Sequence, residues 1–179
     1  MTPTFGVKRI AVVREYVPSD LAAIISLFRR SVHEVASRDY SPAQVSAWAP
    51  ESPDLTAWAR RLETGGVFVD ERENQIRGFA RVDDTGYLDL LYVHPEVQRQ
   101  GVARALLEQV VSWVARRAIR CLHSEVSITA RPFFESVGFR VVREQKVERR
   151  GVVFDNFSME RDMGAEPPGA ADARHAARR

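Results

Sequence analysis

Apolar side chains recur at helical spacing in several stretches of the chain. Leu21, Ile24, Ile25, Phe28 and Val32 share one face, which predicts an amphipathic helix that begins after Pro18-Ser19-Asp20. Residues 101–117 predict a longer helix, because one row of its surface is apolar and another row is polar. Shorter helices are predicted at 42–48, 54–62 and 129–136.

Runs of β-branched and aromatic residues lie between these helices. They predict strands at 9–16, 67–70, 76–82, 87–93, 121–126, 139–147 and 152–159. Residues 87–93 (YLDLLYV) are nearly all apolar or aromatic, which is typical of a buried central strand. The alternation of strands and helices predicts an α/β or α+β fold in which helices pack on a sheet.

Composition narrows the class of protein. The 179 residues predict one domain over 1–163, and the Pro-, Gly- and Ala-rich stretch 164–179 is expected to be a disordered tail. With 26 Lys+Arg against 24 Asp+Glu, no overall field favours nucleic acid or a membrane as partner. Cys121 is the only cysteine, which excludes a disulfide scaffold and a Cys-based zinc site. The four histidines lack metal-ligand spacing, no apolar run reaches about 20 residues, and a cytoplasmic location is expected.

The segment YVHPEVQRQGVARALL carries the clearest chemical signal. A buried strand ends at Val93, and a loop leads to Gly101 at the start of the long helix. Free N–H groups at a helix start attract anions, and small residues there let a phosphate approach the backbone. The loop lacks the Lys and Ser/Thr of a nucleotide-hydrolysing loop and the full G-x-G-x-x-G of a dinucleotide fold. An ordinary strand–loop–helix connection is the alternative.

Two motifs resemble those of the GNAT superfamily of N-acetyltransferases. Gln98-x-x-Gly101-x-Ala103 after Val93-His94-Pro95 resembles the Q/R-x-x-G-x-G/A signature, and residues 130–139 resemble the A-x-x-F-Y-x-x-x-G-F signature. The resemblance covers 12–163 in element order. It implies a mixed, mostly antiparallel sheet of six to seven strands, with acetyl-CoA as cosubstrate, no metal, and an amine acceptor attacking directly in a ternary complex. Family members often dimerise through sheet edges, so a homodimer is one option.

The resemblance also implies the residues that bind acetyl-CoA. Backbone N–H groups of the loop would hold the pyrophosphate, with two arginines near the phosphates; these residues are Gln98, Arg99, Gln100, Gly101, Val102, Ala103 and Arg104. The strand edge at Leu91, Tyr92 and Val93 would pair with the pantetheine arm. The N–H of Leu91 or Val93 would polarise the thioester carbonyl.

Two positions depart from the family pattern. Ser127 stands where the family often has Asn, and it still offers a hydrogen bond to the pantetheine. Phe134 stands where the family's usual general acid is Tyr, so the proton for the leaving thiolate must come from elsewhere or from water. A thiol has a pKa near 8.5, so the thiolate leaves well and an acid is helpful but not indispensable.

The attacking amine needs a base, because an alkyl amine with pKa about 10.4 is protonated at neutral pH. Asp89 on the central strand is the first candidate and Glu125 the second. Strand alternation puts Tyr87 on the face of Asp89 and Tyr92 on the other face. A structural role for Asp89, satisfied by backbone or arginine partners, is the alternative. Tyr40, Trp48 and His33 lie in the N-terminal helices that shape the acceptor pocket in this family.

The sequence thus predicts an N-acetyltransferase acting on a primary amine of a small molecule or peptide. The alternative is a non-catalytic acyl-CoA-binding sensor or interaction module, which the missing tyrosine at Phe134 keeps open. Arg149-Arg150 and the tail are the only signal for nucleic acid. Two arginines at a hairpin turn are usually a solvated tip, and no nucleic-acid partner is expected.

Overall fold

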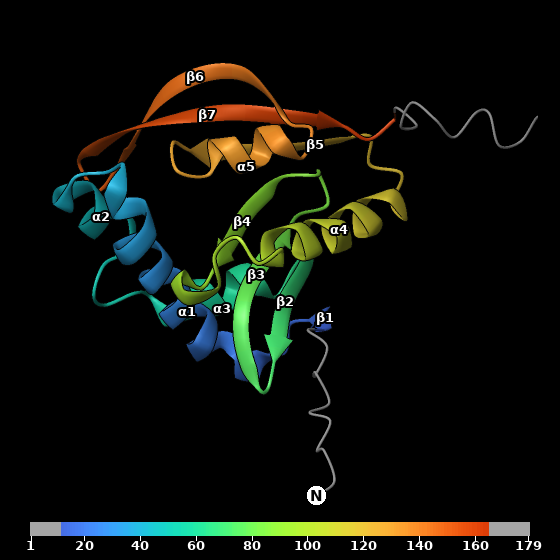
Figure 1. The fold of residues 1–179 in the computed structure, drawn as a ribbon, viewed down its shortest axis with the longest axis horizontal. Helices are drawn as coiled ribbons and strands as arrows, with labels where there is room; N and C mark the ends of the chain where they lie inside the picture. The colour runs from blue at the N-terminus through green and yellow to red at the C-terminus, as the bar shows by residue number, and fades with distance from the viewer. Residues whose placement is uncertain (1–11, 165–179) are drawn as a thin grey trace, which may run out of the picture.

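The strands form two antiparallel sheets (Figure 1). The computed structural model describes residues 12–164. The first sheet has the order β1 (Val12–Glu15), β2 (Gly66–Arg72), β3 (Gln75–Val82), β4 (Leu88–Val93). The second has the order β5 (Cys121–Ser127), β7 (Val152–Asp162), β6 (Arg140–Arg149). The expected fold class is confirmed, although the seven strands divide between two sheets.

Helices cover both faces of the first sheet and also pack on the second. They are α1 (Leu21–Arg30), α2 (Pro42–Trp48), α3 (Leu55–Leu62), α4 (Val102–Ala115) and α5 (Arg131–Ser136). A π-helical turn, Ser31–Val35, extends α1, and short 3-10 turns occupy Pro18–Asp20, Ala36–Arg38 and Pro95–Val97. Ser41 and Asp54 cap α2 and α3, with side-chain oxygens that accept from Gln44 N at 3.3 Å and Ala57 N at 2.9 Å.

Apolar residues gather into two core clusters, one on each face of the first sheet. Between the sheet and α4 lie the buried Leu106, Val110 and Val114, in contact with Leu122 and Met159 of the second sheet. On the other face Ile24 and Val32 of the α1 segment pack with Phe79 and Leu90. Each such side chain contributes roughly 1.5–3 kcal/mol by burial, so the clusters fix α1 and α4 against the sheet.

The two sheets meet where β4 and β5 begin. The strands run parallel there, joined by a single bridge between Tyr87 and His123, and they separate beyond it. His123 N donates to Gly86 O at 3.0 Å, and Ser124 Oγ donates to Leu88 O at 2.6 Å. Gly86 has φ +88°, and a Cβ on it would lie 2.3 Å from Cys121 O, so only glycine permits this approach. The separation leaves the edges of β4 and β5 facing each other across a gap.

A β-bulge interrupts β4 at Asp89. Arg81 lies opposite Leu90 and Val82 opposite Leu88, so Asp89 is an extra residue on its strand. The bulge shifts the alternation of faces, and Leu90 and Tyr92 both pack in the α1 cluster. Because Asp89 is the extra residue, it and Tyr92 are two ladder positions apart and lie on the same side of the strand, so the prediction that they lie on opposite faces is wrong.

Three further expectations concern the two ends of the chain, membrane-spanning helices and metal sites. The 164–179 tail and residues 9–11 of the first predicted strand lie outside the described residues, apart from Gly164. In the part of the chain that the structure describes, no helix is long and apolar enough to cross a membrane. Within residues 12–164, no group of three or more His, Cys, Asp or Glu side chains could hold a metal ion.

Candidate active site

Two cavities adjoin between the separated strands. The large cavity, of about 760 Å³, lies between β4, β5 and the starts of α4 and α5. The small cavity, of about 260 Å³, lies between β4, the β6–β7 hairpin and helices α2 and α3. Five residues line both: Trp48, Asp89, Tyr92, Glu125 and Ser127. A molecule in one cavity can therefore meet a molecule in the other at this junction.

The loop before α4 forms one end of the large cavity. Gly101, the N-cap of α4, has φ +86°, which any L side chain adopts only with strain, and a Cβ there would meet no atom within 4 Å. The helix start therefore faces open space. Five residues predicted here line the large cavity besides Gly101: Gln98, Arg99, Val102, Ala103 and Arg104. Gln100 does not; its side chain donates to Glu96 O at 3.5 Å.

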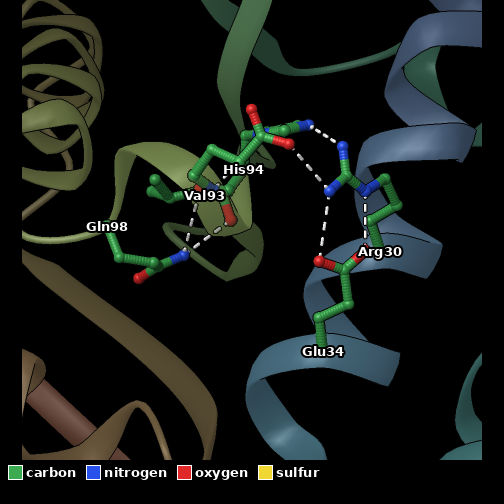
Figure 2. Close-up of polar contacts among 6 residues, drawn as sticks. Arg30, Glu34, Val93, His94 and Gln98 are labelled. Carbon is green, nitrogen blue, oxygen red and sulfur yellow. Dashed lines mark hydrogen bonds and ion pairs between the residues drawn. The ribbon is translucent and has the colours of Figure 1, made fainter.

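Side-chain contacts hold this loop in place (Figure 2). Gln98 Nε2 donates to Val93 O at 2.7 Å, which ties the loop to the end of β4. Arg30, the last residue of α1, lies with Nη1 2.7 Å from His94 Nε2 and also pairs with Glu34 and Glu96. The loop is thus linked both to the strand before it and to α1.

The exposed edge of β4 faces β5. His94 N donates to Arg77 O of the neighbouring strand at 2.8 Å. Because amide directions alternate along a strand, the N–H groups of Leu91 and Val93 point away from β3 and toward the large cavity. Leu91, Tyr92 and Val93 all line that cavity.

Phe134 and Ser127 lie on the β5 side. Phe134 lines the large cavity but is only 5% exposed, with its ring edge-on to Phe139 at a centroid distance of 4.9 Å. Ser127 lines both cavities, and its Oγ accepts from Ala130 N at 3.1 Å at the start of α5.

The two carboxylates at the junction have different surroundings. Asp89 Oδ2 accepts from Arg61 Nε at 2.8 Å and lies 2.9 Å from Arg81 Nη1, and its side chain is 5% exposed. Asp89 Oδ1 is buried and has no hydrogen-bond partner within residues 12–164. Glu125 is exposed, and Gln145 Nε2 donates to its Oε1 at 3.1 Å. Glu125 is therefore the more accessible carboxylate.

Two tyrosines lie close to these acids. Tyr87 lines the small cavity and stacks on His123. Burial raises its pKa above the usual value, and the negative charges of Glu125 and Asp89 add to this. Burial also raises the pKa of Tyr92, against the lowering effect of Trp48 and of the Arg149 and Arg61 charges. Both phenols stay protonated at neutral pH.

The small cavity has an aromatic lining that comes from widely spaced parts of the chain. Tyr40 and Trp48 were predicted here, whereas His33 bonds Ala49 O at 2.8 Å and lines neither cavity. Trp58 lines it as well, and so do Phe28 and Phe154, which were not predicted as site residues. Phe28 belongs to the apolar stripe of α1, so its periodicity indicates core and gives no sign of a site.

Comparisons with known proteins agree with this arrangement. Residues 36–161 match the Acetyltransferase (GNAT) domain family. The chain is 40% identical over 148 residues to the uncharacterised N-acetyltransferase YafP of Escherichia coli (strain K12), covering 82% of this chain and 93% of that protein.

Solved structures show the same fold. A GCN5-related N-acetyltransferase from Rhodopseudomonas palustris superposes with TM-score 0.82 at 26% identity, over 85% of this chain and 95% of that one. The PaiA N-acetyltransferase from Thermoplasma acidophilum in complex with coenzyme A gives TM-score 0.69 at 17% identity, over 86% and 99% of the two chains. The chain belongs to the GNAT family of N-acetyltransferases.

Proposed function

We propose that the protein transfers the acetyl group of acetyl-CoA to a primary amine that attacks directly in a ternary complex. The observation that carries this is the meeting of the two cavities at Asp89, Tyr92 and Glu125. Acetyl-CoA in the large cavity would present its thioester at this junction. The acceptor amine would approach from the small cavity.

The large cavity suits the parts of acetyl-CoA. The N–H groups at the start of α4 face open space beside Gly101 and suit a pyrophosphate. Arg99 and Arg104 are exposed, line the cavity and form no ion pair within residues 12–164, so their charges are available to phosphates. The N–H groups of Leu91 and Val93 suit the pantetheine and the thioester oxygen.

Glu125 is the residue best placed to take a proton from the amine, directly or through a water molecule. Its carboxylate is exposed at the junction, whereas one oxygen of Asp89 is engaged by two arginines. The neutral amine nitrogen then bonds to the acetyl carbon while the carbon–sulfur bond breaks. For an acceptor that arrives as an ammonium ion, one of its two lost protons ends on the coenzyme A thiol and the other is released to solvent.

Tyr92 is the phenol that can pass a proton to the departing thiolate, because Phe134 has no proton to give, and one of the protons lost by the amine then restores the phenol. Tyr92 lines both cavities, and its raised pKa keeps the phenol protonated at neutral pH. Water is the alternative donor.

The direct test is acetyl transfer from acetyl-CoA to a panel of primary amines, with the products identified by mass spectrometry. Acetylated amine and stoichiometric free thiol are expected with the intact protein. Tight acetyl-CoA binding with no product from any amine would favour the sensor alternative, and hydrolysis alone would contradict transfer.

A further inference from the structure

The charged residues of the small cavity are unevenly paired. Three arginines line it: Arg61 pairs with Asp89, and Arg150 Nη1 donates to Ala47 O at 2.6 Å. Arg149 forms no hydrogen bond or ion pair through its side chain to any residue in 12–164, and it lines only the small cavity. Both arginines are exposed at the hairpin turn, as expected of a solvated tip, and both also line the small cavity, which the sequence does not indicate.

The Arg149 charge acts inside this cavity. Its positive charge opposes, without outweighing, the rise that burial causes in the pKa of Tyr40, Tyr87 and Tyr92, three phenols that line the space. The Arg149 backbone pairs with Val152 directly before the turn at Arg150 and Gly151, both of which have positive φ, and its exposed side chain lines the small cavity. A cation that lines a cavity and has no partner within residues 12–164 is suited to an external anion.

Strand register sets the spacing between this cation and the junction. Glu125 lies opposite Ser158 on β7, whereas Arg149 lies opposite Val152. Six residues of strand span about 20 Å at roughly 3.3 Å each. Both side chains line the small cavity, which shortens this span, and the register favours an acceptor whose amine and anion are held apart over one that carries both on one carbon atom.

We infer that the acceptor is an elongated amine whose apolar body carries an anionic group at its far end, and that Arg149 recognises this anion. This rests on the proposed function, because the amine end is placed at the junction by the transfer reaction. Aromatic side chains of Tyr40, Trp48 and Phe154 line the space that the apolar body would fill. At about 260 Å³ the space lies just under the usual range of ligand pockets and suits a small acceptor.

The test compares 4-(aminomethyl)benzoate with benzylamine, which lacks the carboxylate. For Arg149→Gln, kcat/KM should fall about 10-fold for the benzoate, as expected for loss of one charge-assisted hydrogen bond, and stay within about 2-fold for benzylamine. Comparing each amine with itself across variants cancels differences in amine basicity. Arg140→Gln is the matched control, because Arg140 is exposed at the other end of β6 and lines neither cavity.

Equal losses for both amines, or no loss for the benzoate, would overturn the inference. The inference would also be overturned if other amines in the panel were acetylated and neither of these two was. That outcome would leave the proposed function standing. If no amine is acetylated, the proposed function fails, and the anion site is tested by calorimetry with 4-methylbenzoate in the presence of coenzyme A. Binding that Arg149→Gln weakens about 10-fold supports the site, and equal or absent binding contradicts it.

Discussion

At the scale of single residues, the two junction carboxylates differ in what removing their charge would do. Asp89 has two arginine partners, and Arg81 beside it is only 11% exposed, so Asp89 belongs to a largely buried network. Glu125 has one glutamine partner and faces solvent. A change of charge at Asp89 therefore disturbs the fold, and the same change at Glu125 leaves the fold intact.

We expect Glu125→Gln to lower kcat by about 10²- to 10⁴-fold at neutral pH, the usual contribution of a general base. The deficit should shrink as pH rises, because more of the amine is then neutral in solution. Acetyl-CoA affinity and the thermal midpoint should change little. Steady-state kinetics from pH 6 to 10 would measure this.

Asp89→Asn is the comparison variant. It should lower the free energy of unfolding by about 1–3 kcal/mol, because Arg81 and Arg61 lose a charged partner. If Asp89→Asn folds with unchanged stability and shows the pH-dependent loss instead of Glu125→Gln, then Asp89 is the base.

The substitution Phe134→Tyr tests whether a tyrosine at this position, where the family usually has one, affects turnover. We expect Phe134→Tyr to preserve or raise turnover with little effect on acetyl-CoA affinity, because it restores a hydroxyl on the wall of the large cavity. Phe134 is 5% exposed, so a hydroxyl that found no partner would cost about 1–3 kcal/mol of stability. Turnover and unfolding midpoint should be measured together; a large fall in turnover from a stable variant would show that Phe134 contacts the substrate.

The position of the loop before α4 was predictable because its residues are contiguous. Gln98 to Ala103 lie between a strand and a helix that periodicity alone locates, and only Gln100 turns away from the cavity. The small cavity could not be assembled in this way. Arg149 comes from the end of β6 and Glu125 from β5, and only the register of β7 relates them.

At the scale of elements, the predicted helices and strands form close to their expected bounds, and the irregular elements do not follow from periodicity. The bulge at Asp89 depends on how β4 pairs with β3, which no pattern within β4 determines. The π-helical turn at Ser31–Val35 continues the apolar spacing of α1, so Val32 is buried as predicted although the helix type changes.

The start of α4 allows a matched test of anion binding. We expect Gly101→Glu to abolish acetyl-CoA binding, because its carboxylate would repel the phosphates at the helix start. Gly101→Gln has the same size and the same strained φ but no charge, so it should weaken binding less. Calorimetry on both folded variants measures the difference, and equal affinities would show that charge plays no part there.

At the scale of the whole molecule, the two sheets explain why the site exists. They share one bridge at Tyr87 and His123 and a common apolar cluster that joins α4 to Leu122 and Met159. Beyond the bridge the strands part, and the large cavity occupies the gap. The pattern of residues predicts seven strands but not their division between two sheets. The division depends on the close approach of the sheets near Gly86, and that approach is set by the tertiary fold.

A ligand that fills this gap contacts both sheets, so its binding should stabilise the whole fold. At one hundred times its Kd, acetyl-CoA should add about 2.7 kcal/mol, since it binds the native state only. For a protein of this length that corresponds to a rise in Tm of about 5–11 °C. Thermal unfolding with acetyl-CoA measures the rise, with NAD and the Gly101→Glu variant as controls that should show none. An unchanged Tm with saturating acetyl-CoA would mean that the large cavity does not hold it, and an equal rise with NAD would mean that the loop recognises phosphate without selecting coenzyme A.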